Sequence, residues 1–408
     1  MNNKKKKGPE RWLKPRHAVV KKILVFVLGI YSALRYRIRV KPLGEKNERQ
    51  YLILFNHQTA FDQFFVGLVF KRPVYYLASE DLFSNGFVSR LIRYLVNPIP
   101  IKKQTTDPRA VINCIRVARE GGTIALAPEG NRTFSGQTVN IKPSIAQLAK
   151  HLRLPIAFVR IEGGYGVHPR WSDVIRGGGM SAGVSKIIEP DVFSAMSDKE
   201  LYELICKELW VDEATAYCEH PHKKQAEFLE RAIYYCPECK LSRFESHGDL
   251  ISCQKCGLTV RHLPSKELVG VNGAFPYRFV AEWYNAQNDY VNSLYPAKLD
   301  DGVLMEDEVT LSRVILYKKK EKISARATAR LYRDRITISE TDEEIAVYPF
   351  DKVSCGAVLG RNKLNIYIDG EVYQIKGGKR LCALKYLNLL YRYKNVQKGN
   401  EDAKFLGL

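Results

Sequence analysis

Short apolar runs alternate with amphipathic segments over the first half of the chain. Residues 35–41 alternate basic and apolar side chains, the period of a strand, and apolar runs at 51–55, 74–77, 99–101, 123–127 and 155–161 have the length of buried strands. Helical periodicity occupies residues 61–70, 87–96, 108–120, 143–151 and 198–210. Because strands that alternate with helices are typical of α/β folds, we expect an α/β domain with a largely parallel sheet over residues 45–215.

The C-terminal part of the chain has a different pattern. Residues 265–323 include the aromatic-rich stretch 274–294 and predict a helical connector. From about residue 324 the alternation has period two, at 329–339, 345–350 and 363–375, with Asp369-Gly370 as a type I′ hairpin turn. A leucine-rich helix is expected at 379–394. This β-rich module over residues 324–408 resembles the pleckstrin-homology or GRAM layout.

The N-terminal segment is strongly basic. The chain has a formal net charge of +20, and residues 1–50 hold 15 Lys or Arg and three acidic residues. They include the apolar stretch 23–34, 12 residues long. A helix of that length spans about 18 Å, short of the roughly 30 Å hydrocarbon core, so we expect residues 1–44 to lie at an anionic membrane surface. The alternatives are a buried core helix and a secretory signal, although no small-residue cleavage site follows.

Four cysteines are spaced like the ligands of a zinc ribbon. Two CxxC pairs, Cys236 with Cys239 and Cys253 with Cys256, are separated by 13 residues. Four thiolates fill a tetrahedral shell, so we expect a structural zinc in a ribbon module over residues 216–264 and no catalytic cofactor. Zinc thiolates also favour a reducing compartment, hence the cytoplasmic face of the membrane, in a monotopic or peripheral mode.

Two alternatives concern the same module. Cys218, His220 and His222 lie near the CxxC pairs and are candidate ligands, although a fourth partner for them is missing from the sequence. A basic chain with a zinc ribbon also raises the possibility of nucleic-acid binding. Between Cys236 and Cys256, however, three basic residues are matched by three acidic residues. We therefore expect no nucleic-acid partner.

The most specific chemical signal is a His followed five positions later by an Asp. His57 comes directly after an apolar strand, and Asp62 opens the next predicted helix. The chain can turn back at this corner, so that the carboxylate bonds one imidazole nitrogen and leaves the other free to accept a proton. Such a pair is a general base without its own nucleophile, which suits transfer to a hydroxyl brought by the substrate.

A second polar group ends another predicted strand. Glu129, Gly130 and Arg132 follow residues 123–127, at the strand end where α/β sheets bind ligands. A glycine allows close backbone approach, and a guanidinium offers a fork for phosphate. The pair His57/Asp62 and residues 128–132 resemble the first and third motifs of the glycerolipid (lysophosphatidic acid) acyltransferases. Residues 99–103 resemble the second motif and 154–159 the fourth, in the same order, so the resemblance covers roughly residues 20–210.

The resemblance implies a role for each matching residue. His57 would deprotonate the acceptor hydroxyl, which attacks an acyl thioester, and Asp62 would orient His57. Glu129, Gly130 and Arg132 would bind the acceptor, with Arg132 on its phosphate, and Lys102 and Lys103 would assist. Two departures are Asn131, where Thr is commoner, and Lys103, where Arg is usual. Lys lacks the bidentate geometry of Arg, so another head group is an open alternative.

The expected function is therefore membrane-associated acyl transfer. The donor would be acyl-CoA or acyl-carrier protein, and the acceptor a lysophospholipid, foremost 1-acylglycerol 3-phosphate, which becomes phosphatidic acid. Another lysolipid or a glycolipid is an alternative acceptor. A lipid-binding or tethering protein without activity is the alternative from a different class, and the joint presence of the four motif residues argues against it.

Overall fold

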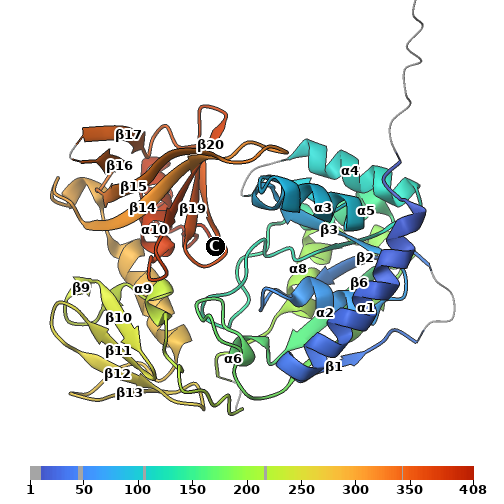
Figure 1. Cartoon of the computed structure of the whole chain (residues 1–408), viewed down its shortest axis with the longest axis horizontal. Coiled ribbons are helices and arrows are strands. Elements are labelled where there is room, and N and C mark those ends of the chain that lie inside the picture. The colour runs from blue at the N-terminus through green and yellow to red at the C-terminus, as the bar shows by residue number, and fades with distance from the viewer. Residues whose placement is uncertain (1–10, 45–48, 104–106, 216–217, 342) are drawn as a thin grey trace, which may run out of the picture.

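The computed structural model describes residues 11–44, 49–103, 107–215, 218–341 and 343–408. Two lobes face each other (Figure 1): an α/β lobe formed by the first half of the chain, and a lobe formed by the other three sheets with the helices α9 and α10. The C-terminus lies between them.

The α/β lobe is built on a seven-stranded sheet with the order β1-β7-β6-β2-β5-β3-β4. Its strands are β1 (Ile38–Lys41), β2 (Leu52–Phe55), β3 (Val74–Ser79), β4 (Ile99–Ile101), β5 (Thr123–Leu126), β6 (Ile156–Glu162) and β7 (Met180–Ile188). All neighbours are parallel except β6 and β7. The predicted α/β domain with a largely parallel sheet is confirmed.

Helices cover both faces of this sheet. They are α1 (Pro15–Tyr36), α2 (Asp62–Val69), α3 (Phe87–Val96), α4 (Pro108–Arg119), α5 (Ser144–Leu152), α6 (Gly164–Val167), α7 (Pro190–Ser194) and α8 (Asp198–Leu209), with a 3₁₀ turn η1 (Glu80–Phe83). Alternate residues of β2 enter two different cores: Leu52 and Leu54 join the one that includes Leu201, and Ile53 and Phe55 the one that includes Phe65. The apolar run at residues 51–55 is continuous, without alternating polar residues, because both faces of the strand are buried.

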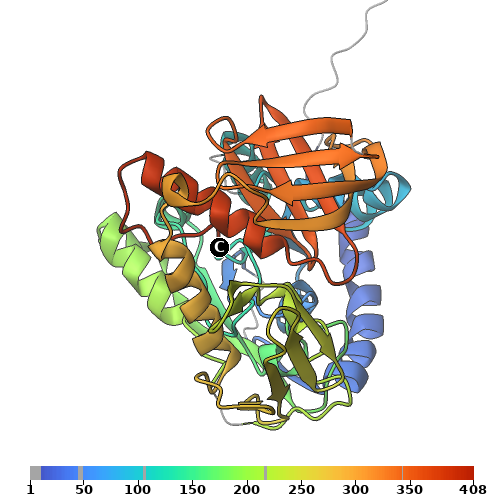
Figure 2. The same cartoon turned by 90° about the vertical axis from the view of Figure 1, so that its left-hand side faces the viewer.

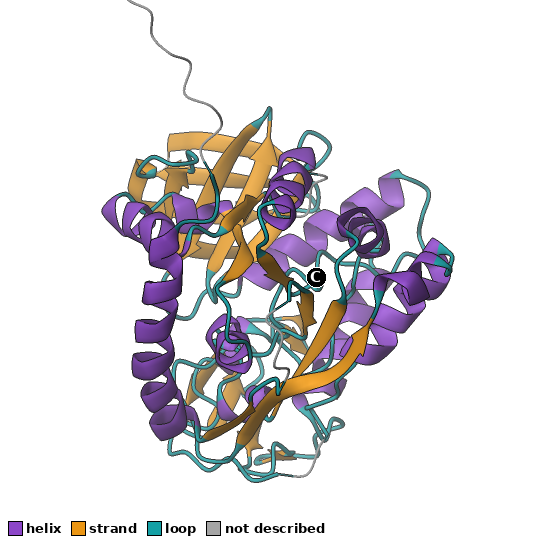
Figure 3. Cartoon of the chain, turned by 90° about the vertical axis from the view of Figure 1, so that its right-hand side faces the viewer, coloured by secondary structure: helices purple, strands orange, loops and turns teal. Residues whose placement is uncertain are grey.

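Helix α1 is longer than the sequence indicated. It has 22 residues, about 33 Å, where the apolar pattern predicted 12, and it includes the beginning of the strand expected at 35–41. Tyr36 is fully buried against Phe61 and Phe65, and Arg37 ends the helix at φ 48°, so only Ile38–Lys41 is a strand. The helix is long and apolar enough to cross a membrane, and it runs along the outside of the α/β lobe (Figure 3).

The second lobe begins with the cysteine-rich segment. It contains η2 (Leu229–Arg231), the paired strands β8 (Tyr235–Cys236) and β9 (Lys240–Leu241), and a sheet of β10 (Phe244–His247), β11 (Leu250–Cys253), β12 (Thr259–His262) and β13 (Leu268–Gly270). The helix α9 (Val280–Ser293) and the turn η3 (Pro296–Lys298) follow. The last ribbon strand, β13, lies beyond residue 264, where the ribbon was predicted to end.

A seven-stranded antiparallel sheet completes the chain, in the order β17-β16-β15-β14-β20-β19-β18. Its strands are β14 (Met305–Arg313), β15 (Glu321–Leu331), β16 (Arg335–Glu340), β17 (Glu343–Pro349), β18 (Cys355–Leu359), β19 (Lys363–Ile368) and β20 (Glu371–Gly377), and α10 (Ala383–Gln397) lies beside it (Figure 2). Strand β14 falls inside 265–323, the range predicted as a helical connector. Asp369 and Gly370 have φ 51° and 77°, as a type I′ turn requires. The likeness to pleckstrin-homology or GRAM modules stays a prediction.

One hydrophobic core joins the parts of the second lobe and reaches the first. It contains Cys236 of the ribbon, Trp283 of α9 and Leu384 of α10, together with Phe134 and Trp171 from the α/β half of the chain. Because a shared core resists separation, the C-terminal sheet is a fixed neighbour of the α/β lobe.

Candidate active site

The His57 side chain is held by a carboxylate at the corner between β2 and α2. Its Nδ1 lies 2.8 Å from Oδ2 of Asp62, the first residue of α2. The Asp62 oxygens also accept hydrogen bonds from the backbone N–H groups of Gln58 and Thr59, at 2.6 to 3.0 Å, and from the Thr59 hydroxyl. Asp62 is fully buried, so this network fixes its geometry. The hydrogen bond expected between His57 and Asp62 is present.

The electrostatics favour a neutral imidazole. Burial lowers the pKa of His57 below its usual range, while the Asp62 hydrogen bond and charge act in the opposite direction, and Arg132 and Lys103 lower it further. A carboxylate can only accept, so the neutral ring donates from Nδ1 and leaves the Nε2 lone pair free. His57 can therefore take a proton from a hydroxyl that reaches Nε2.

Glu129, in the loop of the third motif, is hydrogen-bonded to the backbone of His57. One of its oxygens accepts the His57 backbone N–H at 2.8 Å, and the other accepts the Val139 N–H at 3.1 Å. Burial is the main reason why the pKa of Glu129 rises to about 8. Gly130 forms the turn at φ 67° that returns the chain toward Arg132. These contacts hold Glu129 beside the backbone of His57, and acceptor binding by Glu129 and Gly130 stays a prediction.

Two of the predicted phosphate-binding cations lie close to His57. The Lys103 Nζ donates to Asn131 Oδ1 at 3.0 Å, and Nη1 of Arg132 is buried without a hydrogen-bond partner among the described residues. Burial, with Arg170 and Arg132 adding, lowers the pKa of Lys103 to about 7, and burial and Arg361 lower that of Arg132 to about 10. Lys102 is exposed. Lys103 is thus bonded to the atypical Asn131, a contact that the sequence did not predict.

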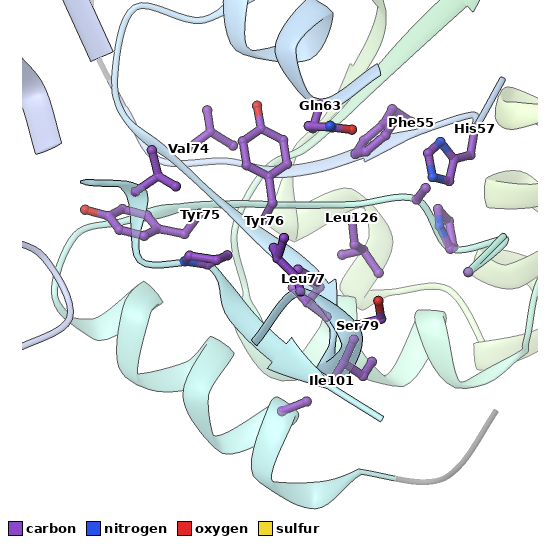
Figure 4. Close-up of a pocket in the computed structure, with 18 of the residues that line it drawn as sticks. Phe55, His57, Gln63, Val74, Tyr75, Tyr76, Leu77, Ser79, Ile101 and Leu126 are labelled. Carbon is purple, nitrogen blue, oxygen red and sulfur yellow. The ribbon is translucent and has the colours of Figure 1, made fainter. Parts of the chain in front are cut away.

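A large cavity connects these groups to an apolar channel. Its volume is about 1030 Å³, and it is lined by His57, Lys102, Lys103, Glu129, Gly130 and Arg132. The remaining lining is mainly apolar and comes from α1, α2, β3, α3, α4 and α5. Figure 4 shows His57 and Phe55 at one end of this lining and Val74 and Tyr75 at the other. The cavity therefore has one polar, cationic end and a long apolar part.

Further polar groups near Arg132 were not identified from the sequence. They are Tyr36, His168, Arg170 and Arg361, which come from the end of α1, the segment after α6 and the β18–β19 turn. The sequence carries no motif for them, since only the fold brings positions up to 325 residues apart together.

The four CxxC cysteines form a candidate metal centre. The sulfurs of Cys236, Cys239, Cys253 and Cys256 all lie within 4.8 Å of one another, and those of Cys236 and Cys256 are 3.7 Å apart. Thiolates about 2.3 Å from a tetrahedral zinc would be separated by about 3.8 Å, so the donor set fits that ion. Among the described residues, this is the only such group, and Cys218, His220 and His222 are outside it. His220 is instead bonded to the Gly177 carbonyl.

Comparison with known proteins finds similarity to acyltransferases. Residues 37–162 match the model of the family described as Acyltransferase. A 1-acyl-sn-glycerol-3-phosphate acyltransferase of Bacillus subtilis (strain 168) is 24% identical over 132 residues, which are 31% of this chain and 65% of that relative. The crystal structure of the 1-acyl-sn-glycerophosphate (LPA) acyltransferase PlsC from Thermotoga maritima has 24% identity and a TM-score of 0.41, covering 48% of this chain and 78% of that one. Residues 37–162, which match the acyltransferase family model, thus carry His57, Asp62, Glu129 and Arg132.

Proposed function

We propose that the protein transfers a fatty acyl group from an acyl thioester to the free hydroxyl of 1-acylglycerol 3-phosphate. The observation that carries this proposal is the placement of the His57–Asp62 pair at the cationic end of an apolar cavity. One cavity then offers a base for a hydroxyl, cations for a phosphate and a lining for hydrocarbon chains. The identity of the acceptor also rests on the similarity to the Bacillus subtilis relative.

The reaction proceeds in two proton transfers around His57. Nε2 accepts the proton of the acceptor hydroxyl as its oxygen attacks the thioester carbonyl, and the Asp62 carboxylate stabilises the resulting imidazolium. The tetrahedral intermediate then collapses, the C–S bond breaks, and His57 returns the proton to the leaving thiolate. Arg132 and Lys103 hold the acceptor phosphate, which places its hydroxyl beside the base.

Access to lipid substrates would come from a membrane-binding surface formed by α1 and α3. Phe26 and Leu34 of α1 are 70% and 74% exposed, and Phe87 and Tyr94 of α3 are 70% and 59% exposed. These two helices are in contact with each other, and both also line the cavity. Apolar side chains beside basic residues would bind an anionic leaflet at the cytoplasmic face, in a monotopic or peripheral mode.

The cysteine group would hold a structural zinc. Four thiolates complete the coordination shell and leave no open position for a substrate, so the ion would stabilise the ribbon. No other cofactor is needed for the acyl transfer described above.

Thiol release tests the proposal directly. Purified full-length protein in liposomes would receive palmitoyl-CoA or palmitoyl-carrier protein, with 1-acylglycerol 3-phosphate as the acceptor. We expect thiol release that depends on the acceptor and disappears in His57→Ala, and the active donor identifies itself. Release that persists in His57→Ala would overturn the mechanism. If no thiol is released, other lysolipid and glycolipid acceptors would be screened. Release with one of them would show a different substrate, and no release with any would favour a lipid-binding protein.

A further inference from the structure

The β18–β19 turn of the C-terminal sheet lies beside the backbone of Arg132, a residue that lines the cavity. It contains Gly360 and Arg361, which lie about 200 positions beyond the end of the family match at residue 162. Two sets of contacts hold it there, one through Arg170 and one through His168 and Asp173. Residues of the appended lobe are thereby brought beside Arg132.

Arg170 fastens this turn to the backbone of Arg132. Its Nε donates to Gly360 O at 2.8 Å, its Nη2 to Val358 O at 3.0 Å and its Nη1 to Arg132 O at 2.7 Å. The guanidinium stacks over the Phe134 ring at 4.1 Å, and only 1% of the residue is exposed. A planar fork with all its nitrogens bonded has a defined position, so the distance between the turn and Arg132 is fixed.

Arg361 is oriented by a second chain of hydrogen bonds. Its Nη2 lies 2.8 Å from His168 Nε2, and His168 Nδ1 lies 2.9 Å from the Tyr36 hydroxyl. A guanidinium can only donate, so His168 accepts at Nε2 and donates from Nδ1 to Tyr36. Burial and the charge of Arg361 lower the pKa of His168 to about 3, which keeps the ring neutral. An ion pair of 3.2 Å to Asp173 completes the support of Arg361.

Positive charge is in excess around this point. Asp173 is shared between Arg361 and Arg231, and no carboxylate is hydrogen-bonded to Arg132 or Arg170 in the described part of the chain. After burial, the charge of Arg361 is the largest cause that lowers the pKa of Arg132, because two nearby positive charges repel. Nη1 of Arg132 and Nε of Arg361 are also buried without hydrogen-bond partners in the described regions. An anion that accepted from both groups would relieve this repulsion and supply the missing acceptors.

We propose that Arg361, supplied by the C-terminal sheet, is a second anion-binding residue of the acceptor site, and that this site selects a dianionic phosphate monoester head group over a phosphate diester. The inference rests on the proposed function. The inference extends the proposed function by naming a specificity residue outside the family domain and by giving the C-terminal lobe a part in substrate recognition. Two guanidinium groups match the two charges of a phosphate monoester, whereas a diester carries one charge and a bulky substituent.

Acceptor kinetics provide the first test. We expect Arg361→Gln to raise the KM for 1-acylglycerol 3-phosphate about tenfold to a hundredfold with little change in kcat, since a charge-assisted contact is lost. The KM for a lysophosphatidylglycerol acceptor should change much less. Arg361→Lys, which keeps the charge, should be intermediate. The matched control is Arg326→Gln, because Arg326 is an 84% exposed arginine of the same sheet, on β15, and should behave as wild type. Equal KM values in Arg361→Gln and Arg326→Gln would overturn the inference.

Direct binding separates this inference from the proposed function. We expect sn-glycerol 3-phosphate to raise the Tm of the full-length wild type, and Arg361→Gln to lose most of that shift. A shift that depends on Arg361 in a protein without acyl transfer would overturn the function and keep the site. Acyl transfer with an unchanged shift in Arg361→Gln would overturn the site and keep the function. If Arg361→Gln lowers the Tm even without ligand, the ligand-induced Tm shift is measured in Arg361→Lys instead.

Discussion

The two halves of the molecule position charged residues near Arg132 by different means. In residues 37–162 the site residues stand next to strand ends, and the His57–Asp62 pair is positioned by its own neighbours, since Asp62 accepts hydrogen bonds from Gln58 and Thr59. In the C-terminal lobe, Arg361 and its neighbour Gly360 are held by distant residues: His168 bonds Arg361 and Arg170 bonds Gly360, almost 200 positions away. Local positioning leaves a motif in the sequence, whereas positioning by distant contacts leaves none.

The largest expected effect is on the activity of the locally positioned site, at His57. We expect His57→Ala to lower kcat by about 10² to 10⁴, because a positioned general base contributes that much, while the Tm stays near the wild-type value. The measurement is acceptor-dependent thiol release together with a thermal melt. His151→Ala is a matched control, since His151 bonds only the Gln147 carbonyl within its own helix among the contacts of the described chain. A variant that retained wild-type kcat would remove His57 from the chemistry.

Metal removal tests the distant lobe. We expect Cys236→Ser to lose the bound zinc and to lower the Tm by about 10 °C, because a structural zinc contributes several kcal/mol and Cys236 lies in the core that joins the second lobe. Zinc content by elemental analysis and a thermal melt give both values. Cys218→Ser is the control, since Cys218 is exposed and outside the metal group. A metal-free wild type with an unchanged Tm would contradict this expectation.

Arg132→Gln compares the two guanidinium groups directly. We expect the KM for the acceptor to rise about tenfold to a hundredfold, as for Arg361→Gln, because each variant loses one charge-assisted contact. The double variant is the informative measurement. If the two groups bind one phosphate, their effects are not additive, and additive effects would mean that they act independently.

The smallest expected effect concerns pH. A lysine is charged below its pKa, and burial lowers the pKa of Lys103 to about 7, so acceptor binding should weaken as pH rises through that value. His57 is needed in its neutral form and its pKa is lowered below the usual range, so the acid limb of activity should lie below that range. We expect kcat/KM for the acceptor to fall severalfold between about pH 7 and about pH 9, and to fall less in Lys103→Arg, which stays charged. Because both proteins use the same acceptor, titration of its phosphate cancels in the comparison. Identical profiles would exclude a contribution from Lys103.

Much of the fold was predictable, because the strands of the first half are buried on both faces and their helices are amphipathic. The end of α1 was not. Residues 35–41 alternate basic and apolar side chains as a strand does, yet Tyr36 stays helical because it packs between Phe61 and Phe65 and bonds His168. The strand β14 was also missed, since its first half is acidic and only its pairing with β15 and β20 defines it.

By itself, the sequence determined the α/β domain, the His57–Asp62 contact and the cysteine spacing of the metal group. These depend on periodicity or on residues a few positions apart, which a short stretch of chain specifies. The tertiary structure decided that Glu129 bonds the backbone of His57, that Lys103 bonds Asn131, and that Arg361 bonds His168. Such contacts form only when distant parts of the chain pack together, because long-range proximity depends on packing and no local pattern encodes it.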